Sequence, residues 1–251
     1  MEALTATVGR YQIRAMVTTP RADRTPAVLV HGLGVSGRYW RPLARRLAPH
    51  RQVLVPDLPG HGRSPAGAPQ LGVAAMAGVL EQWMGAVGIS SAALVGNSLG
   101  CQIAAELAAR WPARVAALVL CGPTVDPAAR RAGIQLLRLA RSAPVEHPAL
   151  YPVVLADYLR AGPRRVLGEL RLMLDHRIEE VLPRVRAPGL VIRGGFDRVV
   201  PRRWAAEVAA LLPRGRLVEV PLAGHAAHFS RPGRVAAVVE DFLASLPQPS
   251  A

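Results

Sequence analysis

The sequence predicts an α/β fold, with a mostly parallel central sheet that is covered by helices on both faces. Short apolar runs of strand length alternate along the chain with longer segments whose apolar residues recur at helical spacing. Half of the residues are apolar (51%), which is enough to bury both faces of such a sheet. The length of 251 residues suits one large domain, or one domain with a modest insertion.

The expected elements follow this alternation from the N-terminus onward. Residues 11–19 alternate between apolar and polar side chains, as in an edge strand. The apolar run 27–30 is too short for a helix, so we interpret it as a central parallel strand. By the same reasoning, strands are expected over residues 52–55, 92–95, 115–121, 189–193 and 216–220, and helices over residues 39–47, 71–87, 201–212 and 232–246.

A mostly helical segment interrupts the alternation between residues 126 and 185. No strand-like run followed by a crossover occurs there. Apolar residues instead recur at helical spacing over residues 128–140, 150–159 and 165–174. We therefore divide the chain into a core, formed by residues 1–122 and 188–251, and a helical insertion formed by residues 123–187.

The pentapeptide Gly96-Asn97-Ser98-Leu99-Gly100 lies where a short apolar strand meets a helix. Its serine would stand at the apex of a very tight turn, with the hydroxyl clear of the sheet. Gly96 and Gly100 have no side chains that would collide with the neighbouring strand or helix in so sharp a turn. A serine that only caps a helix does not need a glycine on each side. We therefore predict that Ser98 is a nucleophile and that the Leu99 amide faces a developing oxyanion.

A serine nucleophile needs a base and an orienting acid at the same edge of the sheet. His225 follows the last expected strand, and Asp197 follows the strand before it. The chain order of nucleophile, acid and base favours these two residues. His228, three residues beyond His225, is the alternative base, and Asp126, after an earlier strand, is the alternative acid.

The segment His31-Gly32-Leu33-Gly34 follows the first central strand. Gly32 and Gly34 would let a backbone amide approach a substrate oxygen closely, so we expect the second oxyanion donor to be the amide of Leu33. His31 is interpreted as a structural hydrogen-bonding residue of this loop and not as a proton carrier. Asp57 is likewise interpreted as a carboxylate that stabilises its own turn.

Taken together, these motifs resemble those of the α/β-hydrolase superfamily, in the same order and over nearly the whole chain. The matching segments are His31–Gly34, Asp57–Ser64, Gly96–Gly100, Asp197–Pro201 and Gly224–His225. The resemblance implies a central sheet with a helical cap inserted into it, here over about residues 123–187. The cap and the sheet would enclose an apolar active-site pocket.

The resulting hypothesis is a soluble serine hydrolase of the carboxylesterase kind that uses no cofactor and no metal. Its expected partner is a small-molecule substrate, an ester of a small to medium apolar acyl compound. His225 would take the proton of Ser98, and Asp197 would fix the tautomer of the imidazole. Water would then release the acyl group from the enzyme.

Three further functions stay open at this point. A carbon–carbon bond hydrolase of vinylogous diketones would bind a carboxylate through cap arginines such as Arg130, Arg138 or Arg171. Members of that group usually carry a second glycine after the nucleophile turn and a tryptophan after the catalytic histidine, where this chain has Cys101 and Ala226. An acyltransferase and a non-catalytic small-molecule receptor on a hydrolase scaffold are the second and third possibilities.

Composition excludes several classes of function. The net charge is +14 and every basic residue is arginine, but the arginines are scattered and aromatic residues are scarce (4%), so no nucleic-acid partner is expected. No run of ~18 apolar residues predicts stable membrane insertion. The N-terminus carries no visible export signal, so we expect a cytoplasmic protein, and a homodimer is left open. Cys101 and Cys121 are expected to be buried free thiols.

Overall fold

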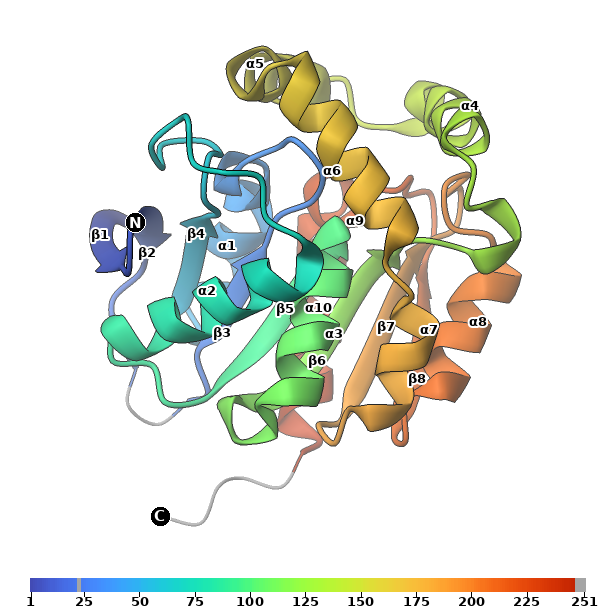
Figure 1. The fold of residues 1–251 in the computed structure, drawn as a ribbon. Coiled ribbons are helices and arrows are strands. Elements are labelled where there is room, and N and C mark those ends of the chain that lie inside the picture. The colour runs from blue at the N-terminus through green and yellow to red at the C-terminus, as the bar shows by residue number, and fades with distance from the viewer. Residues whose placement is uncertain (22–23, 247–251) are drawn as a thin grey trace.

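The computed structural model describes residues 1–21 and 24–246, and its centre is an eight-stranded sheet flanked by helices (Figure 1). The strand order is β1-β2-β4-β3-β5-β6-β7-β8. The strands are β1 (Glu2–Val8), β2 (Tyr11–Val17), β3 (Ala27–Val30), β4 (Val53–Asp57), β5 (Ala92–Ser98), β6 (Val115–Pro123), β7 (Gly189–Gly194) and β8 (Gly215–Val220). From β4 to β8 all neighbouring strands are parallel, so the carboxyl ends of β3 to β8 meet at one edge of the sheet.

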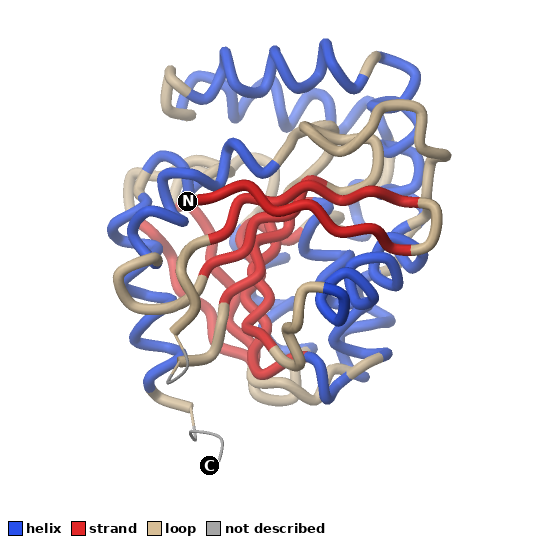
Figure 2. Tube along the Cα trace, turned by 90° about the vertical axis from the view of Figure 1, so that its left-hand side faces the viewer, coloured by secondary structure: helices blue, strands red, loops and turns tan. Residues whose placement is uncertain are grey.

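The antiparallel pair β1 and β2 extends the sheet beyond β4 (Figure 2). The edge strand expected over residues 11–19 is therefore present, as β2, but β1 was not predicted. Most of the side chains of β1 are exposed or half-buried, so its sequence has no apolar run of the kind that marks the central strands. Leu4, Ala6 and Val8 nevertheless pack toward the core while Thr5 and Thr7 are exposed, a period-2 pattern that the prediction overlooked.

Helices cover the sheet on both faces because the side chains of the central strands are buried on both sides. In β3, Val28 and Val30 join one apolar cluster, while Ala27 and Leu29 join the other. The first cluster includes α2 (Val73–Ala86), α3 (Leu99–Arg110) and α8 (Arg202–Leu211). The second includes α1 (Arg41–Leu47), the short α9 (Ala227–Ser230) and α10 (Pro232–Ala244). The predicted α/β fold is confirmed.

The segment between β6 and β7 forms the predicted helical insertion, which we call the cap. Its helices are α4 (Ala132–Ser142), α5 (Leu150–Ala161), α6 (Pro163–Asp175) and α7 (Ile178–Val181), the last of which was not predicted. Figures 1 and 2 show α4 and α5 beyond the edge of the sheet where the parallel strands end. None of the helices within residues 1–21 and 24–246 is both long and apolar enough to cross a membrane.

Candidate active site

Ser98 occupies the sharp turn between β5 and α3. Its backbone has φ 55° and ψ −119°, a conformation that is strained for a residue other than glycine. The two flanking glycines allow this turn. A Cβ on Gly96 would lie 2.4 Å from the carbonyl oxygen of Gly100, and a Cβ on Gly100 would lie 2.2 Å from that of Val30. The local sequence thus places the Ser98 hydroxyl at the carboxyl edge of the sheet.

Asp197 and His225 are brought together by the ends of β7 and β8. Oδ2 of Asp197 lies 3.0 Å from Nδ1 of His225. Oδ1 of Asp197 accepts backbone hydrogen bonds from Val199 (2.8 Å) and Val200 (2.9 Å), which fix the buried carboxylate. Because the carboxylate accepts from Nδ1–H, the neutral imidazole would keep its lone pair on Nε2.

The charge balance around His225 favours its protonated form. Burial opposes that form, but the negative charge and hydrogen bond of Asp197, together with the charge of Glu146, outweigh the cost of burial and raise the pKa of His225. Nε2 of His225 is buried and has no hydrogen-bond partner among the described residues. It is therefore available to a group in the cavity that His225 lines.

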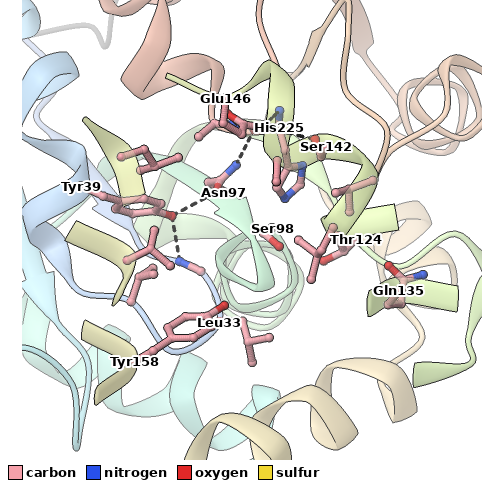
Figure 3. Close-up of a pocket in the computed structure, with 18 of the residues that line it drawn as sticks. Leu33, Tyr39, Asn97, Ser98, Thr124, Gln135, Ser142, Glu146, Tyr158 and His225 are labelled. Carbon is pink, nitrogen blue, oxygen red and sulfur yellow. Dashed lines mark hydrogen bonds between the residues drawn. The ribbon is translucent and has the colours of Figure 1, made fainter. Parts of the chain in front are cut away.

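Ser98 and His225 line the same cavity, which has a volume of about 220 Å³ (Figure 3). Most of its wall is apolar, and its lining residues include Leu139, Tyr151 and Met173 from the cap and Val35 from the core. The close-up shows the Ser98 hydroxyl and the His225 ring directed toward this common space. A substrate held there would contact both groups at once.

The loop after β3 lies directly against the nucleophile turn. A Cβ on Gly32 would lie 3.2 Å from the carbonyl oxygen of Asn97 and 3.3 Å from Cβ of Ser98, so a larger residue would require these neighbours to shift by a few tenths of an ångström. The Gly32 amide is hydrogen-bonded to the hydroxyl of Tyr39 (2.8 Å), and that hydroxyl contacts Oδ1 of Asn97 (3.1 Å), as Figure 3 shows. Leu33 also lines the cavity. These contacts hold the loop beside Ser98 and Leu99, the positions from which oxyanion donors were predicted.

The hydrogen bonds and burial of His31 are those of a residue that stabilises its loop. Its Nε2 accepts a hydrogen bond from the Leu58 amide (3.0 Å), and its Nδ1 lies 3.0 Å from the Gly32 carbonyl oxygen. Burial, helped by the neighbouring His61, lowers the pKa of His31 to about 3. Asp57 accepts hydrogen bonds from the amides of Gly37 (2.7 Å) and Arg63 (2.8 Å), consistent with a turn-stabilising carboxylate.

The alternative base and the alternative acid lie in different surroundings. His228 is fully buried, with its ring 4.0 Å from that of Trp40, and burial lowers its pKa to about 3. Asp126 binds Arg138 (3.1 Å) and Arg203 (2.9 Å) and caps a short 3₁₀ helix. The structure therefore pairs Asp197, and not Asp126, with His225.

Three buried or half-buried carboxylates of the cap accept hydrogen bonds from the backbone of the core loops. Sequence reasoning missed all three, because an isolated acidic residue in a helical segment gives no local signal of a distant partner. Glu146 accepts hydrogen bonds from the amides of His225 and Ala226. Asp157 accepts one from the amide of Ser36 (2.9 Å), and Glu169 accepts one from the amide of Gly34 (3.1 Å). The cap thus holds the loop that carries His225 and the loop that carries Leu33.

Gly122, at the end of β6, is a further residue of the site that sequence reasoning missed. A Cβ at this position would lie 2.9 Å from Nδ1 of His225 and 3.3 Å from Oδ2 of Asp197. Gly122 also has φ +59°, where residues other than glycine are strained. Its place directly after a predicted strand was the signal that could have identified it.

The cap arginines considered as carboxylate ligands do not line the cavity. Arg130 binds Glu179 and backbone carbonyls, Arg138 binds Asp126, and Arg171 is exposed on α6. The lining residues include the acidic Glu146 and no arginine. Among the described residues, no group of three or more histidine, cysteine, aspartate or glutamate side chains is placed to hold a metal ion.

Residues 27–238 match the family model described as "Alpha/beta hydrolase family". The chain belongs to this family. Among curated α/β hydrolases it is 31% identical to the "Putative carbamate hydrolase RutD" of Escherichia coli (strain K12 / DH10B), over 90% of this chain and 94% of that protein.

Solved structures of related hydrolases have the same fold over nearly their whole length. A thermophilic esterase from Thermogutta terrifontis superposes with a TM-score of 0.82 and 25% identity, covering 97% of this chain and 98% of that one. The enol-lactonase from Burkholderia xenovorans LB400 superposes with a TM-score of 0.78 and 25% identity, covering 96% and 100%. This α/β hydrolase therefore resembles proteins named for cleaving bonds at an acyl carbon.

Proposed function

We propose that this α/β hydrolase is a serine esterase that acts on esters of small to medium apolar acyl compounds. The observation that carries the proposal is the arrangement around the cavity. The Ser98 hydroxyl and the unpartnered Nε2 of His225 face one apolar space, while Asp197 holds the opposite nitrogen of the imidazole at 3.0 Å.

The proposed mechanism follows from these positions. His225 Nε2 accepts the proton of Ser98 as Oγ attacks the acyl carbon, and Asp197 stabilises the imidazolium. The amides of Leu33 and Leu99 donate hydrogen bonds to the oxyanion of the tetrahedral intermediate. His225 then donates this proton to the alcohol oxygen as the bond between that oxygen and the acyl carbon breaks. The alcohol departs, and the acyl group remains bound to Ser98. Water, deprotonated by His225, then attacks this ester, and His225 returns the proton to Oγ of Ser98 as the bond from Oγ to the acyl carbon breaks and the acid is released.

The lining of the cavity favours a substrate with a neutral acyl group. Its wall is mostly apolar, and the acidic side chain among its lining residues is Glu146. A substrate carboxylate would be repelled by Glu146 and would find no arginine among the lining residues. A carbon–carbon bond hydrolase that relied on arginines to bind a carboxylate is therefore not favoured.

Hydrolysis of p-nitrophenyl butyrate by the wild type and by Ser98→Ala tests the proposal. The Ser98→Ala variant should lose activity by about 10⁴-fold or more. A fluorophosphonate probe should label the wild type at Ser98 and leave the variant unlabelled. Equal rates for the two proteins, or an unlabelled wild type, would contradict the proposal. The latter result would favour a receptor.

Lactones and carbamates belong in the same substrate panel because they present the same kind of acyl carbon. The related proteins include an enol-lactonase and a protein named as a carbamate hydrolase. An esterase should prefer neutral esters or lactones to carbamates. Product formation that depends on an added alcohol or thiol would instead identify an acyltransferase.

A further inference from the structure

The outer side of the cap exposes an unusual number of large apolar side chains. Ten such residues are exposed among those that the structure describes, and seven of them lie on α4, α5 and α6. We call these seven the apolar cap surface: Leu136, Leu137, Leu139, Tyr151, Leu155, Leu159 and Leu167. So many exposed large apolar residues on three helices of one segment indicate an interaction site.

Helix α5 contributes the most regular part of this surface. Tyr151, Leu155 and Leu159 follow one another at intervals of four, so they lie on one face of the helix. Their exposed fractions are 45%, 61% and 75%. The opposite face of α5 carries Asp157, which is buried against Ser36. The helix is therefore apolar toward the outside and bonded to the core through its inner face.

The exposed charge around the apolar cap surface is positive. Within residues 127–174, the exposed charged side chains are Arg131, Arg141, Arg160, Arg164 and Arg171. Both buried acidic residues of that range, Asp157 and Glu169, bond to core loops, and half-buried Glu146 bonds to the His225 loop. The next exposed acidic side chain along the chain is Asp175, at the C-terminal end of α6. The acidic side chains of this segment are thus bonded to the core, while the exposed charged side chains on or next to the same helices are arginines.

The cavity reaches the exterior within this same surface. Leu139 on α4 and Tyr151 on α5 both line the cavity and are themselves 36% and 45% exposed. Figure 1 shows α4 and α5 at the end of the molecule where the sheet's carboxyl edge lies. Leu139 and Tyr151 therefore belong both to the apolar cap surface and to the lining of the cavity that contains Ser98.

We propose that the apolar cap surface docks on an anionic lipid bilayer, with the mouth of the cavity against the lipid. Leucine and tyrosine side chains would enter the boundary between headgroups and acyl chains, and the surrounding arginines would bind the anionic headgroups. Binding would be peripheral. One consequence of the docking depends on the proposed esterase function: esters dissolved in the lipid would reach Ser98 without crossing water.

Two different occupants fit the surface less well. A second copy of the chain, paired symmetrically, would place the five exposed arginines of each cap against those of its partner. Nucleic acid would satisfy the arginines but would leave the exposed leucines without an apolar partner. An anionic bilayer supplies both negative charge and hydrocarbon.

Vesicle sedimentation of the full-length Ser98→Ala protein tests the proposal without any contribution from turnover. Phosphatidylcholine vesicles with about a third of phosphatidylglycerol should bind the protein, and pure phosphatidylcholine vesicles should bind it at least about tenfold more weakly. Raising the salt concentration should reduce binding to the anionic vesicles, because headgroup attraction is screened.

Matched variants separate the cap from the overall positive charge. Leu155→Gln/Leu159→Gln and Arg131→Glu/Arg141→Glu should each reduce partitioning about tenfold or more. Arg45→Glu/Arg46→Glu, at exposed positions on α1, changes the net charge equally and should have a much smaller effect. All variants alter exposed side chains, and circular dichroism spectra and melting curves would verify their folding.

Three results would overturn the proposal. They are equal binding to anionic and neutral vesicles, equal losses for the α1 and cap arginine variants, and a stable dimer that Leu155→Gln/Leu159→Gln converts to a monomer. The rate with dissolved p-nitrophenyl butyrate is measured separately on the wild type. Failure of the esterase proposal and failure of membrane docking are therefore distinguishable.

Discussion

Oε1 of Glu169, on the cap helix α6, lies 2.8 Å from Nε2 of His61, in the loop after β4. Both side chains are almost fully buried, and the second Glu169 oxygen accepts the Gly34 amide at 3.1 Å. One carboxylate therefore connects the cap to two core loops. The loop that carries Gly34 also contains Leu33, the predicted oxyanion donor.

Replacing Glu169 with alanine should lower the free energy of unfolding by about 3–5 kcal/mol, because His61 and the Gly34 amide would lose a buried partner. Urea denaturation measures this change. Glu180→Ala is the matched control, since Glu180 pairs with Arg177 on the surface of α7 and its loss should cost less than about 0.5 kcal/mol. Similar losses for the two variants would show that the buried link contributes little.

Asp197→Asn should reduce kcat for p-nitrophenyl butyrate by about 10⁴-fold, because an amide can donate to Nδ1 and favour the wrong imidazole tautomer. Steady-state kinetics measure this loss. Asp126→Asn changes the alternative acid, which binds arginines instead of His225, and should reduce kcat by less than about tenfold. A larger effect from Asp126→Asn than from Asp197→Asn would mean that Asp126 is the catalytic acid.

The pH profile of kcat/KM should report the titration of His225. The base must be neutral to accept a proton, so activity falls as the pH drops through its pKa. Since the pKa of His225 is raised above the ordinary histidine value of 6.5, the midpoint of the acid limb should lie above pH 6.5.

Glu146→Gln should move the acid limb to lower pH. Removing this negative charge disfavours the imidazolium and so lowers the pKa of His225, while the amide oxygen can still accept the His225 backbone N–H. Glu180→Gln, at an exposed position on α7, should leave the acid limb in place. An unchanged limb for Glu146→Gln, with only a lower rate, would mean that Glu146 acts on the loop structure and not on the titration.

Gly100→Ala should reduce stability by about 1–3 kcal/mol and also displace Ser98, because the new Cβ would lie 2.2 Å from the Val30 carbonyl oxygen. Thermal unfolding and esterase kinetics measure the two effects. Gly133→Ala is a matched control within α4, where the added Cβ meets nothing within 4 Å and should stabilise the helix by about 0.4–1 kcal/mol. Retained activity in Gly100→Ala would contradict the steric argument.

Local patterns were sufficient to predict most of the core. Central strands such as β3 and β5 are continuous apolar runs because both of their faces are buried, so their composition alone identifies them. The turn at Ser98 was also predictable, because its strain requires glycines within the same five residues. Strand β1 was missed because only alternate side chains such as Leu4 and Val8 are turned toward the core, which gives a weaker signal than a continuous apolar run.

The sequence by itself determined the α/β fold, the helical insertion and the positions of Ser98, Asp197 and His225 as candidates, since each of these was recognised from a short local pattern. Only the tertiary structure decided that Asp197 pairs with His225, that cap carboxylates such as Glu146 bind the core loops, and that the cavity lacks arginine. These contacts join residues that are tens of positions apart. The packing of β7, β8 and the cap decides which of these residues meet. A local pattern of side chains does not predict that packing.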